Sequence, residues 1–124
     1  SAFQGQTNLM DEIIGNLINV LKQEGMYENT LIVFSSDNGG SYELDSTAAN
    51  NWPLRGGKSS MFEGGIRVPA FVSGGALPSA RRGQVEEGLM HIADWYTTFC
   101  SVAGVAATDP HAIKADLPDV EGLD

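Results

Sequence analysis

The pattern of apolar and polar residues along the chain predicts one long helix ahead of two short strands. Between residues 9 and 24 the apolar side chains recur at helical spacing and form one stripe, which is typical of an amphipathic helix. Thr7 or Asn8 is placed to cap its start, and Gly25 to end it. The stripe comprises Leu9, Met10, Ile13, Ile14, Leu17, Ile18 and Leu21. We expect this helix to cover a sheet.

Residues 30–35 form the most apolar run of the chain and predict a buried strand. The four consecutive apolar residues at 31–34 indicate a strand covered on both faces, as at the centre of an α/β sheet. A second strand is predicted over 68–73, with Pro69 near its start, where a missing N–H is tolerated. Residues 37–66 between the strands form a long loop with three Gly-Gly pairs. A loop of this length in a compact domain is usually functional.

The last third of the chain predicts a short helix and a polar tail. Asp94 is expected to be the N-cap of a helix over 95–103, which Gly104 ends. The tail, residues 108–124, contains two prolines and few apolar residues, so we expect a loop or linker there.

Composition and charge narrow the possible functions. The 124 residues, 42% hydrophobic and 19% charged, suit one small globular domain. The formal net charge of -9 argues against a nucleic-acid binder, which needs a basic face. No stretch reaches the ~18 consecutive apolar residues of a membrane span. The only cysteine, Cys100, excludes an internal disulfide, and its apolar context predicts a buried, inert thiol.

Two oxygen-bearing side chains, Asp37 and Asn38, directly follow the first predicted strand. Ligand sites in open α/β sheets lie outside the carboxyl ends of strands. A carboxylate and an amide carbonyl are hard oxygen ligands that suit Ca²⁺ or Mg²⁺. The alternative is an ordinary Asp-Asn-Gly turn. Since Ca²⁺ takes about six to eight oxygens, the remaining ligands have to come from elsewhere.

Lys58 lies among glycines and is a candidate for binding an anion. A nucleotide-binding P-loop is rejected, because that motif needs a glycine at position 52, which is Trp. A solvated surface lysine is the alternative. The flanking glycines let the backbone pack closely, and an ammonium can act as a compact charge on an anionic oxygen. No His, Cys or carboxylate cluster has the spacing of a zinc site.

In combination, these segments resemble the sulfatase family, most closely its arylsulfatase B (N-acetylgalactosamine-4-sulfatase-like) branch. The matching stretches are Thr30-Leu31-Ile32-Val33-Phe34-Ser35-Ser36-Asp37-Asn38-Gly39-Gly40, Asn50-Asn51-Trp52-Pro53-Leu54-Arg55-Gly56-Gly57-Lys58 and Glu63-Gly64-Gly65-Ile66-Arg67-Val68-Pro69. The resemblance implies an alkaline-phosphatase-like α/β/α sandwich and hydrolysis of sulfate esters. It also implies that Asp37 and Asn38 ligate a divalent cation, usually Ca²⁺, and that Lys58 contacts the sulfate. Arg55, Glu63 and Arg67 are interpreted as residues that hold the loop.

The sequence also departs from the family pattern. The family's nucleophile is a formylglycine made within Cys/Ser-x-Pro-x-Arg, and Cys100 is followed instead by Ser-Val-Ala. We therefore expect residues 1–107 to be the C-terminal portion of a catalytic domain whose N-terminal part is missing, with 108–124 leading toward the remainder. The chain alone is expected to be inactive.

The intact parent is expected to hydrolyse aryl sulfates or sulfate esters of sulfated sugars, with a sulfated glycan as one such substrate. A phosphatase or phosphonate hydrolase of the same superfamily and a truncated, non-catalytic binding protein are the alternatives. Family habit implies a secreted, lysosomal or periplasmic location, although the first residues lack a signal-peptide pattern.

Overall fold

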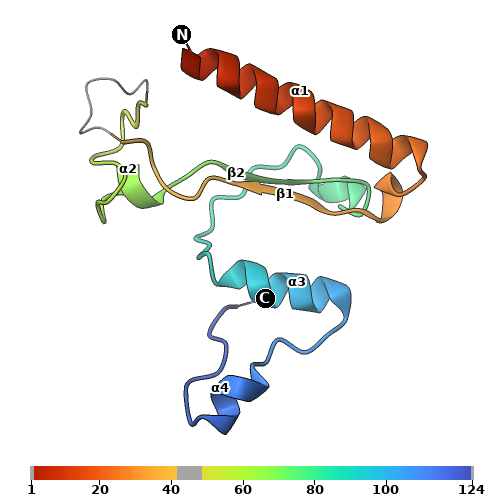
Figure 1. Cartoon of the computed structure of the whole chain (residues 1–124), viewed down its shortest axis with the longest axis vertical. Coiled ribbons are helices and arrows are strands. Elements are labelled where there is room, and N and C mark those ends of the chain that lie inside the picture. The colour runs from red at the N-terminus through yellow and green to blue at the C-terminus, as the bar shows by residue number, and fades with distance from the viewer. Residues whose placement is uncertain (1, 42–48, 124) are drawn as a thin grey trace. The chain divides into compact units, whose positions relative to one another are not determined.

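The structure, a computed structural model, describes residues 2–41 and 49–123 (Figure 1). It comprises two compact units, Ser1–Gln84 and Val85–Asp124, and each is described by itself. The first unit contains α1 (Ala2–Gln23), η1 (Tyr27–Asn29), β1 (Ile32–Ser35), α2 (Glu63–Ile66), β2 (Ala70–Ser73) and η2 (Ser79–Arg81). The second contains α3 (Asp94–Ala103) and α4 (Pro110–Lys114).

Helix α1 begins at Ala2, so the prediction that Thr7 or Asn8 caps its start is wrong. The Thr7 hydroxyl donates to Phe3 O at 3.0 Å, a bond to the preceding turn that lets a threonine lie inside a helix. The predicted end is correct. Gly25 has a φ of 68°, and Met26 N donates to Leu21 O at 2.8 Å, as in a Schellman ending.

The predicted apolar stripe of α1 is only partly covered among the described residues. Ile14, Ile18 and Leu21, which recur at helical spacing, are half-buried. Leu9, Ile13 and Leu17 are exposed, with exposed fractions of 53–57%. The expectation that this helix covers a sheet is not confirmed, because among the described residues α1 contacts η1 and neither strand.

Strands β1 and β2 pair antiparallel, with Ile32 opposite Ser73 and Ser35 opposite Ala70. The rings of Phe34 and Phe71 stack across the pair with centroids 5.1 Å apart. The expectation of a strand buried on both faces is not met, because β1 pairs only with β2 among the described residues. Its apolar side chains are consequently half-buried.

The antiparallel pairing determines where the long loop lies. The residues that follow β1 and those that precede β2 emerge at the same end of the strand pair, where Ser36 N donates to Pro69 O at 3.2 Å. In Figure 1, α2 lies at this end of the strand pair. Asp37, Asn38 and the glycine-rich loop are thus attached to one end of the sheet.

In the second unit, α3 ends as predicted at Gly104, which has a φ of 70°. The N-cap prediction for Asp94 is wrong, since this residue is the first of the helix and bonds to no amide of α3's first turn. Its carboxylate instead accepts hydrogen bonds from His91 N at 2.7 Å and Leu123 N at 2.9 Å. Asp94 therefore joins α3 to the end of the chain.

The segment 108–124, for which we expected a loop or linker, contains α4. The side chain of Asp109 caps this helix by accepting from His111 N at 2.9 Å and Ala112 N at 3.2 Å. The segment then returns to α3, where the Thr97 hydroxyl donates to Leu123 O at 2.6 Å. The domain boundary at residue 107 stays a prediction.

Candidate functional site

Asp37 and Asn38 lie in a turn directly after β1. Asp37 Oδ1 accepts from Asn38 N at 2.9 Å, and the Ser36 hydroxyl donates to Asn38 O at 3.0 Å. The turn considered as the alternative is therefore formed. It leaves two oxygens available, because no hydrogen bond within the described ranges ends on Asp37 Oδ2 or on the Asn38 side chain.

The three glycine pairs of the loop pack against one another. Gly39 N donates to Gly65 O at 2.9 Å, and Gly64 N donates to Arg55 O at 2.8 Å. A Cβ on Gly39 would overlap Gly64 O, and one on Gly64 would overlap the backbone oxygen of Gly56. Side chains at these positions would push apart the backbone segments of the loop. This steric limit explains why the stretch is rich in glycine.

Asn51 joins the two arms of the loop through its side chain. Its Nδ2 donates to Gly40 O at 2.8 Å and to Gly56 O at 3.2 Å, while its Oδ1 accepts from Gly40 N at 2.8 Å. These three hydrogen bonds are called the Asn51 clamp below. In the sequence, Asn51 stands out only as part of the family motif. An Asn close to a Pro is also typical of an ordinary turn.

The backbone of Lys58 lies against the Asp37–Asn38 turn. Lys58 N donates to Gly40 O at 3.0 Å, and Gly40 is the second residue after Asn38. The Lys58 side chain is exposed, and its ammonium has no hydrogen bond or ion pair within the described ranges. The segments that carry the sequence-predicted site residues are thus brought together by direct backbone contact.

Three charged residues of the motif make contacts within the same loop. The Arg55 guanidinium lies 4.0 Å from the ring centroid of Phe62, a cation–π contact. Arg67 Nη1 lies 3.2 Å from Glu63 Oε2, one turn apart around α2. The ion pair is exposed and adds little stability. The Arg55 contact agrees with the interpretation of this residue as one that holds the loop. For Glu63 and Arg67, whose ion pair is local to α2, that interpretation stays a prediction.

The donor set fits part of a hard-cation site. Asp37 supplies a carboxylate oxygen and Asn38 an amide oxygen, which are ligands that Ca²⁺ and Mg²⁺ prefer. Across residues 2–41 and 49–123, no group of three or more His, Cys, Asp or Glu could hold a metal ion. Two oxygens make up only part of the coordination sphere of Ca²⁺ or Mg²⁺, so further ligands would be required.

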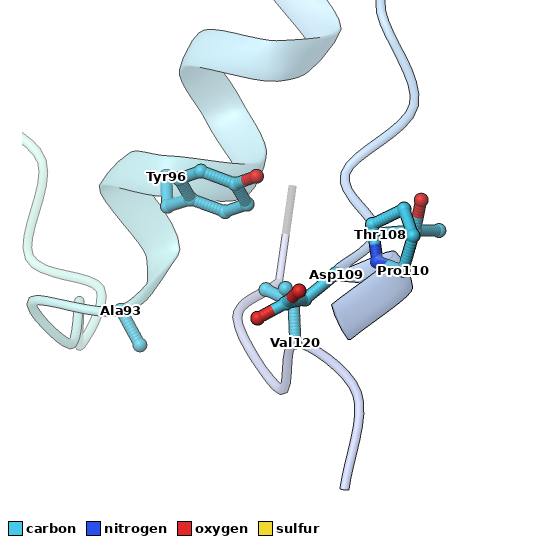
Figure 2. A pocket seen from close by; sticks show the side chains of 6 residues that line it. All are labelled: Ala93, Tyr96, Thr108, Asp109, Pro110 and Val120. Carbon is cyan, nitrogen blue, oxygen red and sulfur yellow. The ribbon is translucent and has the colours of Figure 1, made fainter. Parts of the chain in front are cut away.

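A cavity of about 560 Å³ lies in the second unit, away in sequence from the predicted site residues (Figure 2). It is lined by Ala93, Tyr96, Thr108, Asp109, Pro110 and Val120. The pKa of the Tyr96 hydroxyl is raised, and the main cause is its hydrogen bond with the Cys100 side chain. The Asp109 carboxylate already caps α4. We therefore assign this open cavity no role in the chemistry.

Comparison with known proteins places these features in one family. The Sulfatase family model matches residues 2–105. The chain is 42% identical over 101 residues to arylsulfatase J of Mus musculus, which covers 82% of this chain and 16% of that protein. It is 33% identical over 117 residues to a sulfatase of Formosa agariphila, covering 87% of this chain and 20% of that protein.

A further relative is N-acetylgalactosamine-6-sulfatase of Mus musculus, 35% identical over 97 residues, covering 77% of this chain and 18% of that protein. The chain thus spans between a sixth and a fifth of the length of these relatives. Assignment to the arylsulfatase B branch stays a prediction. In the part of the chain that the structure describes, no helix is both long and apolar enough to span a bilayer.

Proposed function

Because this chain belongs to the sulfatase family, we propose that it forms part of an enzyme that hydrolyses sulfate esters. Family membership implies the alkaline-phosphatase-like α/β fold, and the mixed α/β composition of the chain agrees with it. The observation that carries the proposal is the backbone contact between the Asp37–Asn38 turn and Lys58, made through Gly40. This contact holds the proposed cation ligands and the proposed sulfate-contacting lysine on neighbouring segments at one end of a strand pair.

Asp37 and Asn38 would hold a divalent cation, Ca²⁺ or alternatively Mg²⁺. The open Asp37 Oδ2 and the unbonded Asn38 side chain support this role. Such a cation would supply positive charge to the sulfate oxygens. The turn contributes by fixing the carboxylate, since the bond from Asn38 N to Asp37 Oδ1 restrains it before any ligand binds.

Lys58 would contact the sulfate group of the substrate. Its ammonium is exposed and without a partner among the described residues, so it can reach an anion without first breaking an ion pair. A fixed positive charge lowers the energy of a transition state in which negative charge builds up on the sulfur-bound oxygens.

The remaining features of the proposal concern the intact protein. The formylglycine motif has no match in this sequence, so we propose that the chain alone is inactive and that the nucleophile belongs to another part of the parent. The substrates would be aryl sulfates or sulfated sugars, including glycans. A secreted, lysosomal or periplasmic location follows from the family.

The test is hydrolysis of 4-nitrophenyl sulfate by the full-length protein that carries this segment, with 4-nitrophenyl phosphate in parallel. We expect turnover of the sulfate, and a loss of kcat of about 10²-fold in Lys58→Ala. Lys114→Ala, which removes an exposed lysine from the other unit, is the matched control and should leave kcat unchanged. Unchanged kinetics in Lys58→Ala would remove Lys58 from the site. Preference for the phosphate would identify a phosphatase of the same superfamily instead.

A further inference from the structure

The site described above depends on two loop arms that no helix or strand of the described residues connects. Residues 37–40 follow β1, whereas Lys58 lies in a different arm, 18 residues beyond Gly40. Their relative position therefore has to be set by contacts between the arms. Inside the loop, the side chain that bridges both arms most directly is Asn51.

The Asn51 clamp uses nearly the full hydrogen-bonding capacity of one amide group. Both Nδ2 protons are donated, to Gly40 O and Gly56 O, and Oδ1 accepts from Gly40 N. An amide carries two N–H donors and one carbonyl acceptor on the same carbon, an arrangement that a carboxylate or a hydroxyl lacks. Asn51 is half-buried, so the carbonyls it serves would be poorly compensated by water if the amide were removed.

Gly40 connects this clamp to both groups that would meet the substrate. Its carbonyl oxygen accepts from Asn51 Nδ2 and from Lys58 N, and Asn38 lies two residues before it. Its position also excludes a side chain, because a Cβ on Gly40 would lie 2.5 Å from Ala49 Cβ and 3.2 Å from Asn51 Oδ1. A displacement of Asn51 is therefore transmitted to the Asn38 side and the Lys58 side together.

We propose that Asn51 is a positioning residue that sets the distance between the Asp37–Asn38 cation ligands and the Lys58 ammonium. This inference rests on the proposed function, since it assigns Asn51 a task in the same site. In this role Asn51 would act through the backbone of Gly40 and Gly56 rather than by contact with substrate or cation. Loss of the clamp should lower catalysis because small misplacements of reacting groups cost up to about 10²-fold in rate.

The test compares three variants of the full-length protein: Asn51→Ala, Asn51→Asp and the matched control Asn50→Ala. Asn50 is the same residue type at the adjacent position, is exposed, and bonds only locally by accepting from Trp52 N at 2.9 Å. We expect Asn51→Ala to lower kcat for 4-nitrophenyl sulfate about 10- to 100-fold with a smaller change in KM. Asn50→Ala should leave both kcat and KM unchanged.

Asn51→Asp separates positioning from packing. The carboxylate has almost the volume of the amide but offers no protons to the two carbonyls, so it should fail to rescue kcat. Wild-type kinetics in either Asn51 variant, or full rescue by Asn51→Asp, would overturn the inference. If the wild-type protein hydrolyses no sulfate ester, the proposed function fails separately. Hydrogen exchange of the backbone amides then tests the Asn51 clamp. Faster exchange at Gly40 and Lys58 in Asn51→Ala supports the clamp, and unchanged exchange overturns it.

Discussion

The Asp94 carboxylate and the Leu123 backbone amide are joined by a 2.9 Å hydrogen bond across 29 residues of sequence. The same carboxylate accepts from His91 N at 2.7 Å. Sequence reasoning had noted both segments without relating them. One ionised side chain thus ties the residues before α3 and the residues after α4 to the same helix start.

The first prediction concerns the pH dependence of this contact. The hydrogen bond from Leu123, followed by that from His91, lowers the pKa of Asp94 below its ordinary value. A lowered folded-state pKa means that the stabilisation is fully present above the ordinary carboxyl pKa, about 3.9, and is lost as pH falls through the lowered value. We expect the Leu123 amide resonance to titrate with a midpoint below about 3.9. A midpoint at or above that value would contradict the assigned hydrogen bonds.

Thr97 should stabilise the same junction through its hydroxyl. This residue is 7% exposed, and its Oγ1 lies 2.6 Å from Leu123 O and 2.9 Å from Asp94 O. Thr97→Val keeps the shape but removes the donor, so we expect a loss of about 1–3 kcal/mol in the free energy of unfolding measured in urea. Thr97→Ser keeps the hydroxyl and should lose less. Equal losses in the two variants would assign the effect to packing.

Gly39 is predicted to tolerate no side chain. In Gly39→Ala the new methyl group would overlap the carbonyl oxygen of Gly64, which is backbone and cannot rotate away. We expect a destabilisation of about 1–3 kcal/mol together with reduced sulfate-ester hydrolysis. Gly88→Ala is the control, because a Cβ there meets nothing within 4 Å. Wild-type stability in Gly39→Ala would show that the loop is less tightly packed than described.

The proposed role of Asp37 as a cation ligand predicts a specific Ca²⁺ dependence. Asp37→Asn keeps the shape of the side chain and removes its negative charge, so the full-length protein should require a higher Ca²⁺ concentration for half-maximal activity. Treatment with a chelator should inactivate the wild-type protein reversibly. Asp11→Asn, which removes a charge from exposed α1, should leave the Ca²⁺ requirement unchanged. The same requirement in Asp37→Asn as in wild type would exclude Asp37 as a ligand.

The sequence was sufficient to predict local structure wherever one residue type has one physical role. Gly25 and Gly104 end helices because both adopt a positive φ. The two apolar runs form strands within two residues of the expected bounds. Prediction failed where a polar side chain had several possible partners. Asp94 suits an N-cap by spacing, yet its carboxylate bonds to Leu123, a contact that no local pattern encodes.

The same limit applies to the candidate site. Asp37, Asn38 and Lys58 were predicted as site residues from their place in the sequence and from the family resemblance, and in the structure their segments meet through Gly40. The residue that joins the arms, Asn51, has no distinctive signal in the sequence, because an Asn beside a Trp-Pro pair also fits a simple turn. The prediction of a buried central strand was wrong for a related reason. Apolar composition shows what a strand is able to bury, whereas the structure shows what actually lies beside it.

The Asn51 clamp binds Gly40, before the segment 41–50, and Gly56, after it. One side chain therefore holds the backbone on both sides of that segment. We expect the spacing of the Asp37–Asn38 turn and Lys58 to depend on this cross-link rather than on the length of the chain that it closes.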